Sequence, residues 1–301
     1  MWSLSSLRLL HELRLRGTLT AAAEALFLSR SAASHQLATL ERTVDAPLTE
    51  KVGRGLRLTE VGTELALRAE RILQEIELAG AAIERLRGGL SGTVRVGWFQ
   101  SVAIRLLAQV LTDLREQHPQ LRVESIGMAA ENALVAVRAG DVDVVIVPSY
   151  GGAPLDVPDG LHNELLFHDP VRLAVPADHP AARSRVPVQI ADLVDERWIA
   201  GAPGSFFGQL VPRLCHQAGF RPDITHHNGD SAIIASLVAA GHGIAFIPAS
   251  ADLGSWPGVA IQEVDAKDAE RDVLAVMRAS SRHRPTVGTV LQAIRHRCPP
   301  A

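Results

Sequence analysis

The chain has 301 residues, of which 47% are hydrophobic and 21% charged, and its formal net charge is −3. This length exceeds one ordinary domain and supplies apolar material for more than one core, which excludes a disordered chain. No apolar run approaches the roughly 18 residues of a membrane span, and charges interrupt the N-terminal segment. We therefore expect no membrane segment, no signal peptide and a cytoplasmic location.

The segment from Leu19 to Leu40 predicts two short helices joined by a tight turn, which is a helix-turn-helix. The expected N-caps are Thr20 and Ser29. The expected core positions are Ala22, Ala23, Leu26, Ala33, Leu37 and Leu40. The second helix presents an exposed polar face made of Arg30, Ser31, Ser34 and His35. Such a face fits a DNA major groove, because its donors and acceptors reach base edges and phosphates. The alternative is an ordinary amphipathic helix pair with a solvated face.

A basic hairpin is expected after this motif. Gly53 and Gly55 set a turn between two short extended segments that carry Lys51, Arg54 and Arg57. We interpret the hairpin as a wing in which Arg54 is best placed to enter a minor groove; an ordinary surface turn is the alternative. Residues 1 to 58 carry eight Lys and Arg against five Asp and Glu, and this basic region favours a local nucleic-acid contact.

Residues 59 to 86 predict one long helix whose apolar residues recur at spacings of three and four. This near-heptad seam consists of Val61, Leu65, Ala69, Ile72, Ile76, Ala79, Ile83 and Leu86. A second copy of the chain is the favoured cover for the seam, because little of the sequence nearby could cover it. Packing against its own domain is the alternative. Gly88 and Gly89 are expected to break the helix and supply a hinge.

Nearly the whole chain resembles the LysR-type bacterial transcriptional regulators. The resemblance rests on GTLTAAAEALFLSRSAASHQLATLE, then APLTEKVGRGLRLTEVG, a long helix and an α/β region. Thr49 stands where the family usually has an aromatic residue, and Leu9 and Leu10 replace its usual phenylalanine. The resemblance implies double-stranded promoter DNA and a small-molecule effector as partners, a homodimer or homotetramer, and contact with RNA polymerase. It implies no cofactor and no enzymatic activity.

From Thr93 onward the pattern alternates between strands and helices. Strands are expected at 93–98, 121–126, 142–147, 171–175, 198–199, 244–247 and 273–277. Helices are expected at 104–118, 134–139, 207–218, 231–240 and 286–297. Two α/β lobes joined by two crossovers resemble the periplasmic-binding-protein type of ligand domain.

The expected domain plan follows from these patterns. It comprises a winged helix-turn-helix at 1–58, a linker helix at 59–90 and an effector-binding domain at 91–301. Within the last domain, lobe I covers about 91–167 and 267–301, and lobe II covers about 168–266.

The cleft between the lobes is the expected effector site, because ligands bind at the carboxyl ends of parallel strands beside helix N-termini. The strand-to-helix junctions supply the candidates Phe99, Gln100, Ser101, Asn132, Ser149, Tyr150, Ser205, Phe206, Asp230 and Ser231. Ser101 and Ser205 are the strongest, since a hydroxyl at a helix start can bind a carboxylate or carbonyl group; helix capping is the alternative. Aromatic candidates could line the pocket or pack the lobes. No basic residue is placed in the cleft, so the charge of the effector stays open.

Catalytic and metal sites are not indicated. Ser205 lies in the second position of its Gly-rich segment, unlike a nucleophile elbow, and no P-loop or dinucleotide fingerprint occurs. His226 and His227 lack the further ligands of a metal site. Cys215 and Cys298 are expected to be reduced, with a redox switch as the alternative. The competing hypothesis is a solute-binding protein or enzyme that uses its N-terminal region only for dimerisation.

Overall fold

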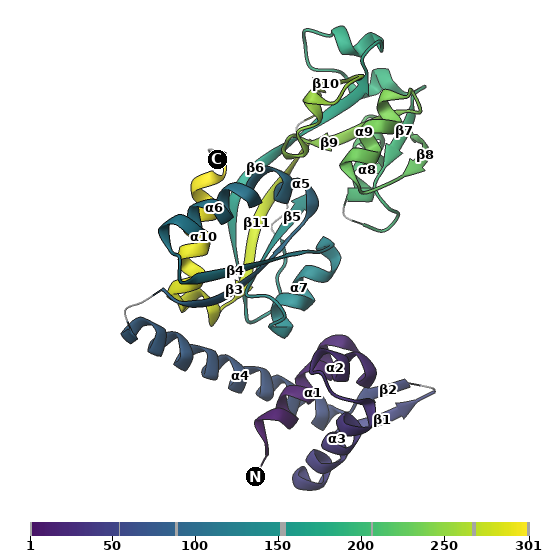
Figure 1. The fold of residues 1–301 in the computed structure, drawn as a ribbon. Helices are drawn as coiled ribbons and strands as arrows, with labels where there is room; N and C mark the ends of the chain where they lie inside the picture. Colours follow the sequence, from purple (N-terminus) through teal and green to yellow (C-terminus); the bar gives the residue numbers. More distant parts are fainter. Residues whose placement is uncertain are drawn as a thin grey trace.

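The structure is a computed structural model that describes residues 2–53, 55–87, 90–150, 155–205, 207–266 and 269–299. Figure 1 shows a small helical head at the N-terminus, one long helix, and an elongated α/β body in two lobes. No helix within these described ranges is long and apolar enough to cross a membrane. The fold class expected from the sequence is confirmed.

The head (residues 4–58) is a three-helix bundle with a two-stranded wing. Its elements are α1 (Leu4–Arg16), α2 (Leu19–Ala25), α3 (Arg30–Val44), β1 (Thr49–Val52) and β2 (Gly55–Leu58). The core contains the expected Ala22, Ala23, Ala33, Leu37 and Leu40, with Leu26 half-buried against them. The strands pair antiparallel around Gly53, whose φ of +60° suits glycine.

Hydroxyl side chains begin both helices of the helix-turn-helix. Ser29 accepts a hydrogen bond from a first-turn N–H of α3 at 3.1 Å, which confirms it as the cap. The prediction that Thr20 caps α2 is wrong, because Thr18 accepts the capping bond at 3.2 Å and Thr20 lies inside the helix. Gly17, with φ of +74°, ends α1, and α2 follows so closely that its cap falls on the next residue.

A carboxylate on α3 anchors the wing to that helix. Glu41 Oε1 accepts hydrogen bonds from the backbone N–H groups of Leu48 and Thr49 at 2.9 and 3.0 Å, and from Thr49 Oγ1 at 3.0 Å. Leu48 is fully buried beside them. Thr49 therefore holds the base of the wing by hydrogen bonding to Glu41.

The long helix α4 (Glu60–Arg87) begins where the sequence predicts. Thr59 Oγ1 accepts a hydrogen bond from Gly62 N at 3.0 Å. A Cβ at Gly62 would lie 2.0 Å from the carbonyl oxygen of Leu48. Only glycine therefore allows α4 to approach the base of the wing this closely.

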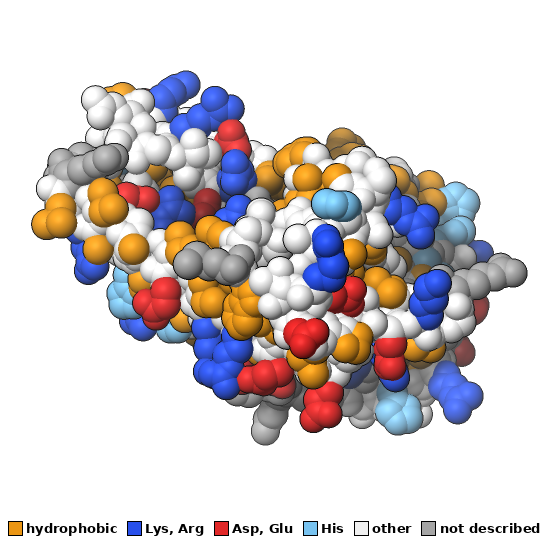
Figure 2. Space-filling view, turned by 90° about the horizontal axis from the view of Figure 1, so that it is seen from below, with side chains coloured by type: hydrophobic (Ala, Val, Ile, Leu, Met, Phe, Trp, Pro, Cys, Tyr) orange, Lys and Arg blue, Asp and Glu red, His pale blue; other side chains and the backbone are white. Residues whose placement is uncertain are grey.

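The apolar seam of α4 divides into a covered and an exposed part. Leu65 and Ala69 are buried in the core of the head. Ala79 is exposed as well, and the large exposed members, with their exposed fractions, are Val61 (46%), Ile72 (38%), Ile76 (46%), Ile83 (52%) and Leu86 (87%). Figure 2 shows hydrophobic side chains along the part of the surface where α4 runs. Packing within the chain therefore leaves most of the seam open. The expected hinge at Gly88 and Gly89 lies outside the described residues.

The body is built on one mixed sheet that runs through both lobes (Figure 1). Its strands are β3 (Gly92–Trp98), β4 (Leu121–Gly127), β5 (Val144–Tyr150), β6 (Leu161–Pro176), β7 (Arg197–Ala200), β8 (Asp223–His227), β9 (Ile244–Pro248), β10 (Val259–Glu263) and β11 (Glu270–Arg278). The order is β4-β3-β5-β11-β6-β9-β7-β8, and β10 pairs with β6. The sheet is continuous because β6 pairs with β11 in the first lobe and with β9 in the second.

Helices flank this sheet near the positions that the sequence predicts. They are α5 (Gln100–Val102), α6 (Ala108–Gln117), α7 (Ala130–Ala139), α8 (Leu210–Gln217), α9 (Ser231–Ala239) and α10 (Pro285–Arg297). A π-helical turn at Ala103–Leu107 joins α5 to α6, so that helix begins earlier than expected and places Ser101 in its first turn. Strands β8 and β10 were not predicted, and β6 begins ten residues before the expected segment.

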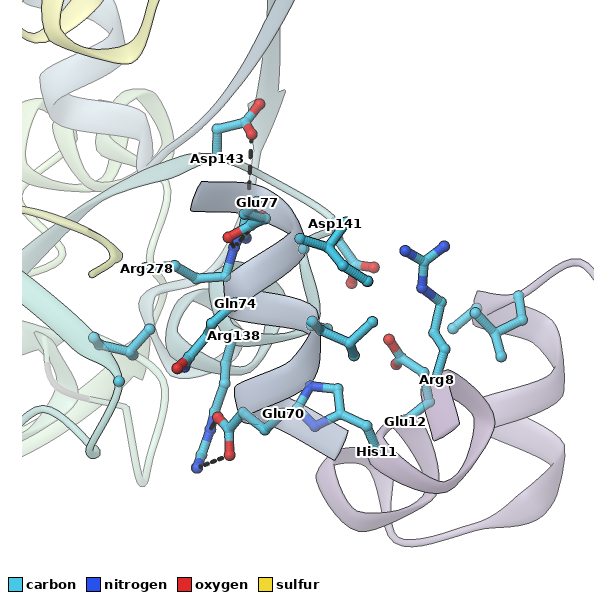
Figure 3. A pocket seen from close by; sticks show the side chains of 18 residues that line it. Arg8, His11, Glu12, Glu70, Gln74, Glu77, Arg138, Asp141, Asp143 and Arg278 are labelled. Carbon is cyan, nitrogen blue, oxygen red and sulfur yellow. Dashed lines mark hydrogen bonds and ion pairs between the residues drawn. The ribbon is translucent and has the colours of Figure 1, made fainter. Parts of the chain in front are cut away.

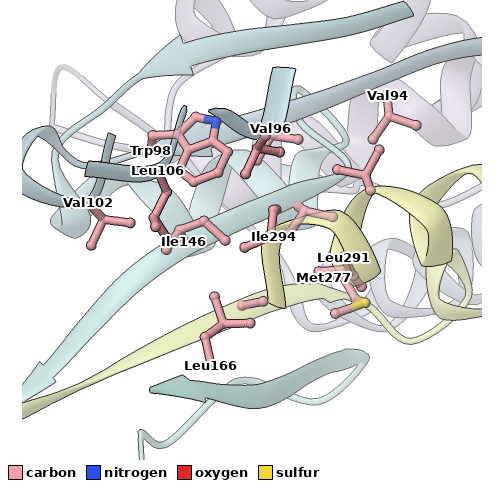
Figure 4. Packing of buried hydrophobic residues seen from close by; sticks show 14 of the residues in the cluster. Val94, Val96, Trp98, Val102, Leu106, Ile146, Leu166, Met277, Leu291 and Ile294 are labelled. Carbon is pink, nitrogen blue, oxygen red and sulfur yellow. The ribbon is translucent and has the colours of Figure 1, made fainter. Parts of the chain in front are cut away.

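Each lobe has its own hydrophobic core. In the first lobe, Trp98 of β3 packs with Leu106, Ile146 and Ile294, as Figure 4 shows. In the second lobe, the rings of Trp198 and Phe246 lie 4.6 Å apart between their centroids. The two cores hold the lobes as separate packed units, with the cleft residues between them.

Candidate functional site

The DNA-reading face expected on α3 is open to solvent. Arg30, Ser31, Ser34 and His35 are all exposed on this helix. Ala33 and Leu37 on the opposite side are buried in the head and fix the orientation of the face. Exposed donors and acceptors on one side of a helix are what major-groove recognition requires.

The hairpin supplies basic side chains beside this face. Lys51 is exposed on β1. Arg57 on β2 is 71% exposed and pairs with Glu50 across the ladder, with a shortest N–O distance of 2.6 Å. Thr20 is exposed on α2, and Ser29 is exposed at the α3 cap. Arg54 lies outside the described residues.

A cavity of about 330 Å³ lies between the lobes. Its lining includes the predicted residues Phe99, Gln100, Ser101, Tyr150, Ser205 and Ser231. Three further candidates do not line it: Asn132 is exposed on α7, Ser149 is buried in β5, and Asp230 caps α9. Phe206 lies outside the described residues. The structure thus gathers junctions from both lobes around one ligand-sized space.

Arg271, which the sequence analysis missed, is the cation of this cavity. It lies on β11, is 4% exposed, and donates to Asp169 Oδ2 through Nη2 at 2.7 Å and Nε at 2.9 Å. Its Nη2 also donates to Ser101 Oγ at 2.7 Å, and its Nη1 donates to the Tyr150 hydroxyl at 3.0 Å. The guanidinium carbon lies 4.8 Å from the centroid of the Phe99 ring. Arg271 therefore orients three predicted lining residues at once.

Burial shapes the chemistry of this cluster. It raises the pKa of the Tyr150 hydroxyl, and the neighbouring charge of Arg271 opposes that rise only in part. Tyr150 is therefore a neutral hydroxyl group at physiological pH. The Asp169 carboxylate balances Arg271, so the floor of the cavity is polar but carries no uncompensated charge.

The two serines judged strongest from sequence are both engaged in the protein's own hydrogen bonds. Ser101 Oγ accepts from Arg271, as described above. Ser205 Oγ donates to Ala202 O at 2.8 Å and accepts from Gly208 N at 2.9 Å. Ser205 thus caps its own turn, in line with the alternative that this serine is a helix cap. It also lines the cavity.

Gln100 joins the two lobes across the mouth of the cavity. Its Nε2 donates to Asp230 Oδ2 at 2.9 Å, and its Oε1 accepts from Ser231 N at 3.2 Å. The hydrogen bond from Gln100, followed by those from Ile233 and Ala232, lowers the pKa of the Asp230 carboxyl. One amide side chain of the first lobe therefore hydrogen-bonds to the Asp230 carboxylate and the Ser231 N–H at the start of α9 in the second lobe.

The thiols do not form a reactive pair. Burial raises the pKa of Cys215 to about 12 and that of Cys298 to about 11, and both are free cysteines. Low thiolate content is the opposite of what a redox-sensing cysteine needs. Within the described ranges, no group of three or more His, Cys, Asp or Glu residues is arranged to hold a metal ion.

A winged helix-turn-helix joined by one helix to a two-lobed body with a ligand-sized cavity defines a ligand-responsive, DNA-binding regulator. Comparison with known families agrees. Residues 4–63 match the bacterial regulatory helix-turn-helix of the lysR family, and residues 87–299 match the LysR substrate binding domain. The chain belongs to the LysR family of transcriptional regulators, which overturns the competing hypothesis of an enzyme or solute-binding protein.

Individual relatives support the same assignment. The chain is 32% identical over 251 residues to the HTH-type transcriptional regulator CbbR of Xanthobacter flavus, covering 82% of this chain and 73% of that one. It is 29% identical over 220 residues to the transcriptional dual regulator GltC of Bacillus subtilis, covering 73% and 72%. A full-length OxyR variant from Pseudomonas aeruginosa shares the fold, with a TM-score of 0.70, 21% identity and 99% coverage of both chains.

Proposed function

We propose that this regulator works in the cytoplasm, where an effector held between the lobes changes how paired heads sit on promoter DNA. The observation that carries the proposal is the presence in one chain of an exposed polar recognition helix and a separate interlobe cavity. The effector must have a different affinity for two arrangements of the protein, since equal affinity would shift nothing.

The proposed DNA contacts divide by role. Arg30, Ser31, Ser34 and His35 read base edges from α3 in the major groove. Ser29, Thr20, Lys51, Arg54 and Arg57 contact phosphates or the adjacent minor groove. A structure of the family member CbnR with its target DNA, similar to this chain at a TM-score of 0.56 and 23% identity, supports a fold of this kind on duplex DNA.

A second copy is the proposed partner of the open α4 seam. Ile72, Ile76 and Ile83 form an exposed apolar stripe on a helix that already rests on its own head. A matching helix would bury this stripe and bring two heads to symmetric half-sites. We propose a homodimer or a homotetramer, with contact to RNA polymerase once bound at a promoter.

The effector is proposed to bind in the cavity between Phe99, Tyr150 and Arg271. Hydroxyl and guanidinium groups would orient its polar atoms, while the aromatic rings and neighbouring apolar side chains cover its body. The proposed domain limits are those expected from sequence: 1–58, 59–90 and 91–301, with lobe I at about 91–167 and 267–301 and lobe II at about 168–266.

The test is a gel-shift measurement on the full-length protein. The labelled duplex is the DNA upstream of its own gene, and random duplex is the competitor at about 0.15 M salt, where nonspecific binding is weakened. A saturable complex that survives the competitor is expected. A complex that random DNA removes equally well would contradict sequence-specific binding to that promoter.

A further inference from the structure

Helix α7 spans the distance between the interlobe cavity and the head. Its first residues, Ala130 and Glu131, line the cavity. Its last turn carries Arg138, and Asp141 follows the Gly140 that ends the helix. At about 1.5 Å per residue, this ten-residue helix is about 15 Å long. One rigid element therefore has one end at the proposed effector site and the other at the DNA-binding head.

The C-terminal end of α7 is fastened through Glu70 of α4. Arg138 donates to both carboxylate oxygens of Glu70, through Nε at 2.7 Å and Nη2 at 3.0 Å. Arg14 of α1 donates to the same carboxylate at 2.6 Å. Figure 3 shows Glu70 facing Arg138, with His11 of α1 on its other side. Glu70 is thus shared between the head and the body.

A second ion pair joins the head to the body directly. Arg16 Nη2 donates to Asp141 Oδ1 and Oδ2 at 2.9 and 2.7 Å, and Arg16 Nε is held by Glu12 at 2.6 Å. The last turn of α1 therefore reaches the C-terminal end of α7 in two ways: Arg16 bonds Asp141 just beyond that helix, and Arg14 shares the Glu70 carboxylate of α4 with Arg138. The bidentate bonds from Arg138 to Glu70 fix orientation as well as distance.

These contacts are only partly open to solvent. The side chains of Arg138 and Glu70 are 17% and 11% exposed. Burial opposes ionisation of Glu70, but the hydrogen bond and charge of Arg138, with the charges of His11 and Arg14, outweigh it and lower its pKa. Glu70 is therefore ionised at neutral pH, and its bonds are screened less than those of a surface pair.

A cavity of about 340 Å³ lies at this joint. Its acidic lining residues are Glu12, Glu70, Glu77, Asp141 and Asp143. Each is already paired with arginine: Glu12 and Asp141 with Arg16, Glu70 with Arg14 and Arg138, Glu77 with Arg278, and Asp143 with Arg278 and Arg284. The acidic side chains of this cavity therefore hold the joint together.

The rest of α7 is packed so that its two ends move together. Ala133 and Val137 are fully buried against Val145 and Val147 of β5. The first turn, in contrast, has no side-chain cap at Ala129 and meets the cavity directly. A displacement imposed on that turn by an occupant of the cavity is passed to Arg138 without a flexible joint between them.

We infer that α7 transmits occupancy of the cavity to the head, with Arg138 and Asp141 acting as positioning residues that touch neither DNA nor effector. The inference rests on the proposed function, since it takes the cavity as the effector site. Because coupling is reciprocal, any change that undocks the head must also alter the first turn of α7.

Hydrogen exchange on the full-length protein tests this coupling without an effector or an operator. The variants are Asp141→Arg, Arg16→Asp, and the two together, which restores the pair with reversed charges. Asp113→Arg is the matched control, because Asp113 pairs with Arg297 in the first lobe away from this joint. Circular dichroism confirms that each variant is folded.

Asp141→Arg is expected to raise amide exchange about two- to fivefold, the effect of losing one ion pair, both in α1 and in residues 129–134. Arg16→Asp also loses the pair with Glu12, so it should raise exchange in α1 further. The double variant should return residues 129–134 to the wild-type rate, while α1 keeps the part of the increase that comes from the lost Arg16–Glu12 pair. Asp113→Arg should leave both segments unchanged. Faster exchange in α1 with none in residues 129–134 would overturn the inference, as would no change in either segment.

The same samples separate failure of the inference from failure of the proposed function. In the gel-shift assay, a wild-type protein that does not prefer its promoter would refute specific regulation there, whatever the exchange result. A wild-type protein that binds its promoter but shows no coupling between α1 and residues 129–134 would refute the role of α7 alone.

Discussion

The carboxylate of Asp169 lies 2.7 Å from the guanidinium of Arg271, and the two side chains are only 2% and 4% exposed. Asp169 also accepts hydrogen bonds from the backbone and hydroxyl groups of Ser250, at 2.9 and 2.7 Å. Breaking a buried pair leaves one charge uncompensated, which costs more than the pair itself contributes.

We therefore expect Asp169→Ala to lower the free energy of unfolding by about 3–5 kcal/mol, measured by urea denaturation. Asp113→Ala, which removes the partner of Arg297 at a more open site, is the control and should shift the unfolding midpoint little. An Asp169→Ala midpoint that matches the control would show that solvent or a rearrangement compensates Arg271.

His35 on the exposed face of α3 gives a test of base reading. His35→Ala should weaken binding to the promoter duplex about five- to a hundredfold, the range of one lost base contact, and weaken random duplex much less. Thr43→Ala, also exposed on α3 but near its C-terminal end, is the matched control. Equal losses on both duplexes for His35→Ala would leave this residue with no part in specificity.

Gln100 should control how far the lobes close. Its amide makes both hydrogen bonds to Asp230 and Ser231, so Gln100→Ala removes both bonds from this bridge. We expect the variant to have a larger radius of gyration in small-angle scattering than the wild type at the same concentration. Gln189→Ala removes a bond to Asp265 within the second lobe and should leave the radius unchanged. Identical radii for all three proteins would mean that the bridge does not hold the cleft.

Phe27 adopts a left-handed backbone conformation, which asparagine enters more readily than phenylalanine. Its φ is +54° and its side chain is 98% exposed, so no apolar contact offsets the left-handed backbone. Asparagine enters this region more readily, and Phe27→Asn should stabilise the head by about 1 kcal/mol in thermal unfolding. Phe27→Val should act in the opposite direction, because β-branched residues are disfavoured there. The reverse order of the two variants would contradict this account of the turn.

Acid should loosen the joint between head and body. The pKa values of Glu70 and Glu77 are lowered from their ordinary value of 4.5, because hydrogen bonds and charges from Arg138 and Arg278 outweigh the opposing effect of burial. A lowered folded-state pKa gives stabilisation that is complete above 4.5 and is lost as pH falls through the folded value. We expect the urea midpoint to fall as pH drops below about 4.5. Glu70→Gln should reduce the change of the urea midpoint with pH. An unchanged pH dependence would mean that other carboxyl groups cause it.

The sequence was most informative where local rules determine structure. The Ser29 cap and the polar face of α3 follow from residues only a few positions apart. The error at Thr20 has a local cause as well, since Gly17 moves the start of α2. Strand β8 was missed because Asp223, His226 and His227 give it a polar pattern without a clear buried face.

Long-range pairing explains what could not be predicted at the site. Arg271 stands between Glu270 and Asp272 in a segment that resembles a solvated charge run. Its burial depends on Asp169, which lies 102 residues earlier in the chain. Residues 161–168 are likewise extended because β11 pairs with them, from more than 100 residues away. One signal was available: Asp169 and Arg271 carry opposite charges, and each lies within a few residues of a predicted crossover between the lobes.

Strand β6 changes its partners next to Asp169, where the chain leaves β11 in one lobe and joins β9 in the other. A rotation of the lobes about this point gives displacements that grow with distance from it. Arg271, bonded to Asp169, lies close to this point, so its hydrogen bond to Asp169 changes little during such a rotation. Gln100 and Ser231 lie on different lobes and farther from this point. Such a rotation would therefore change the distance between them at the mouth of the cavity more than it changes the contacts of Arg271.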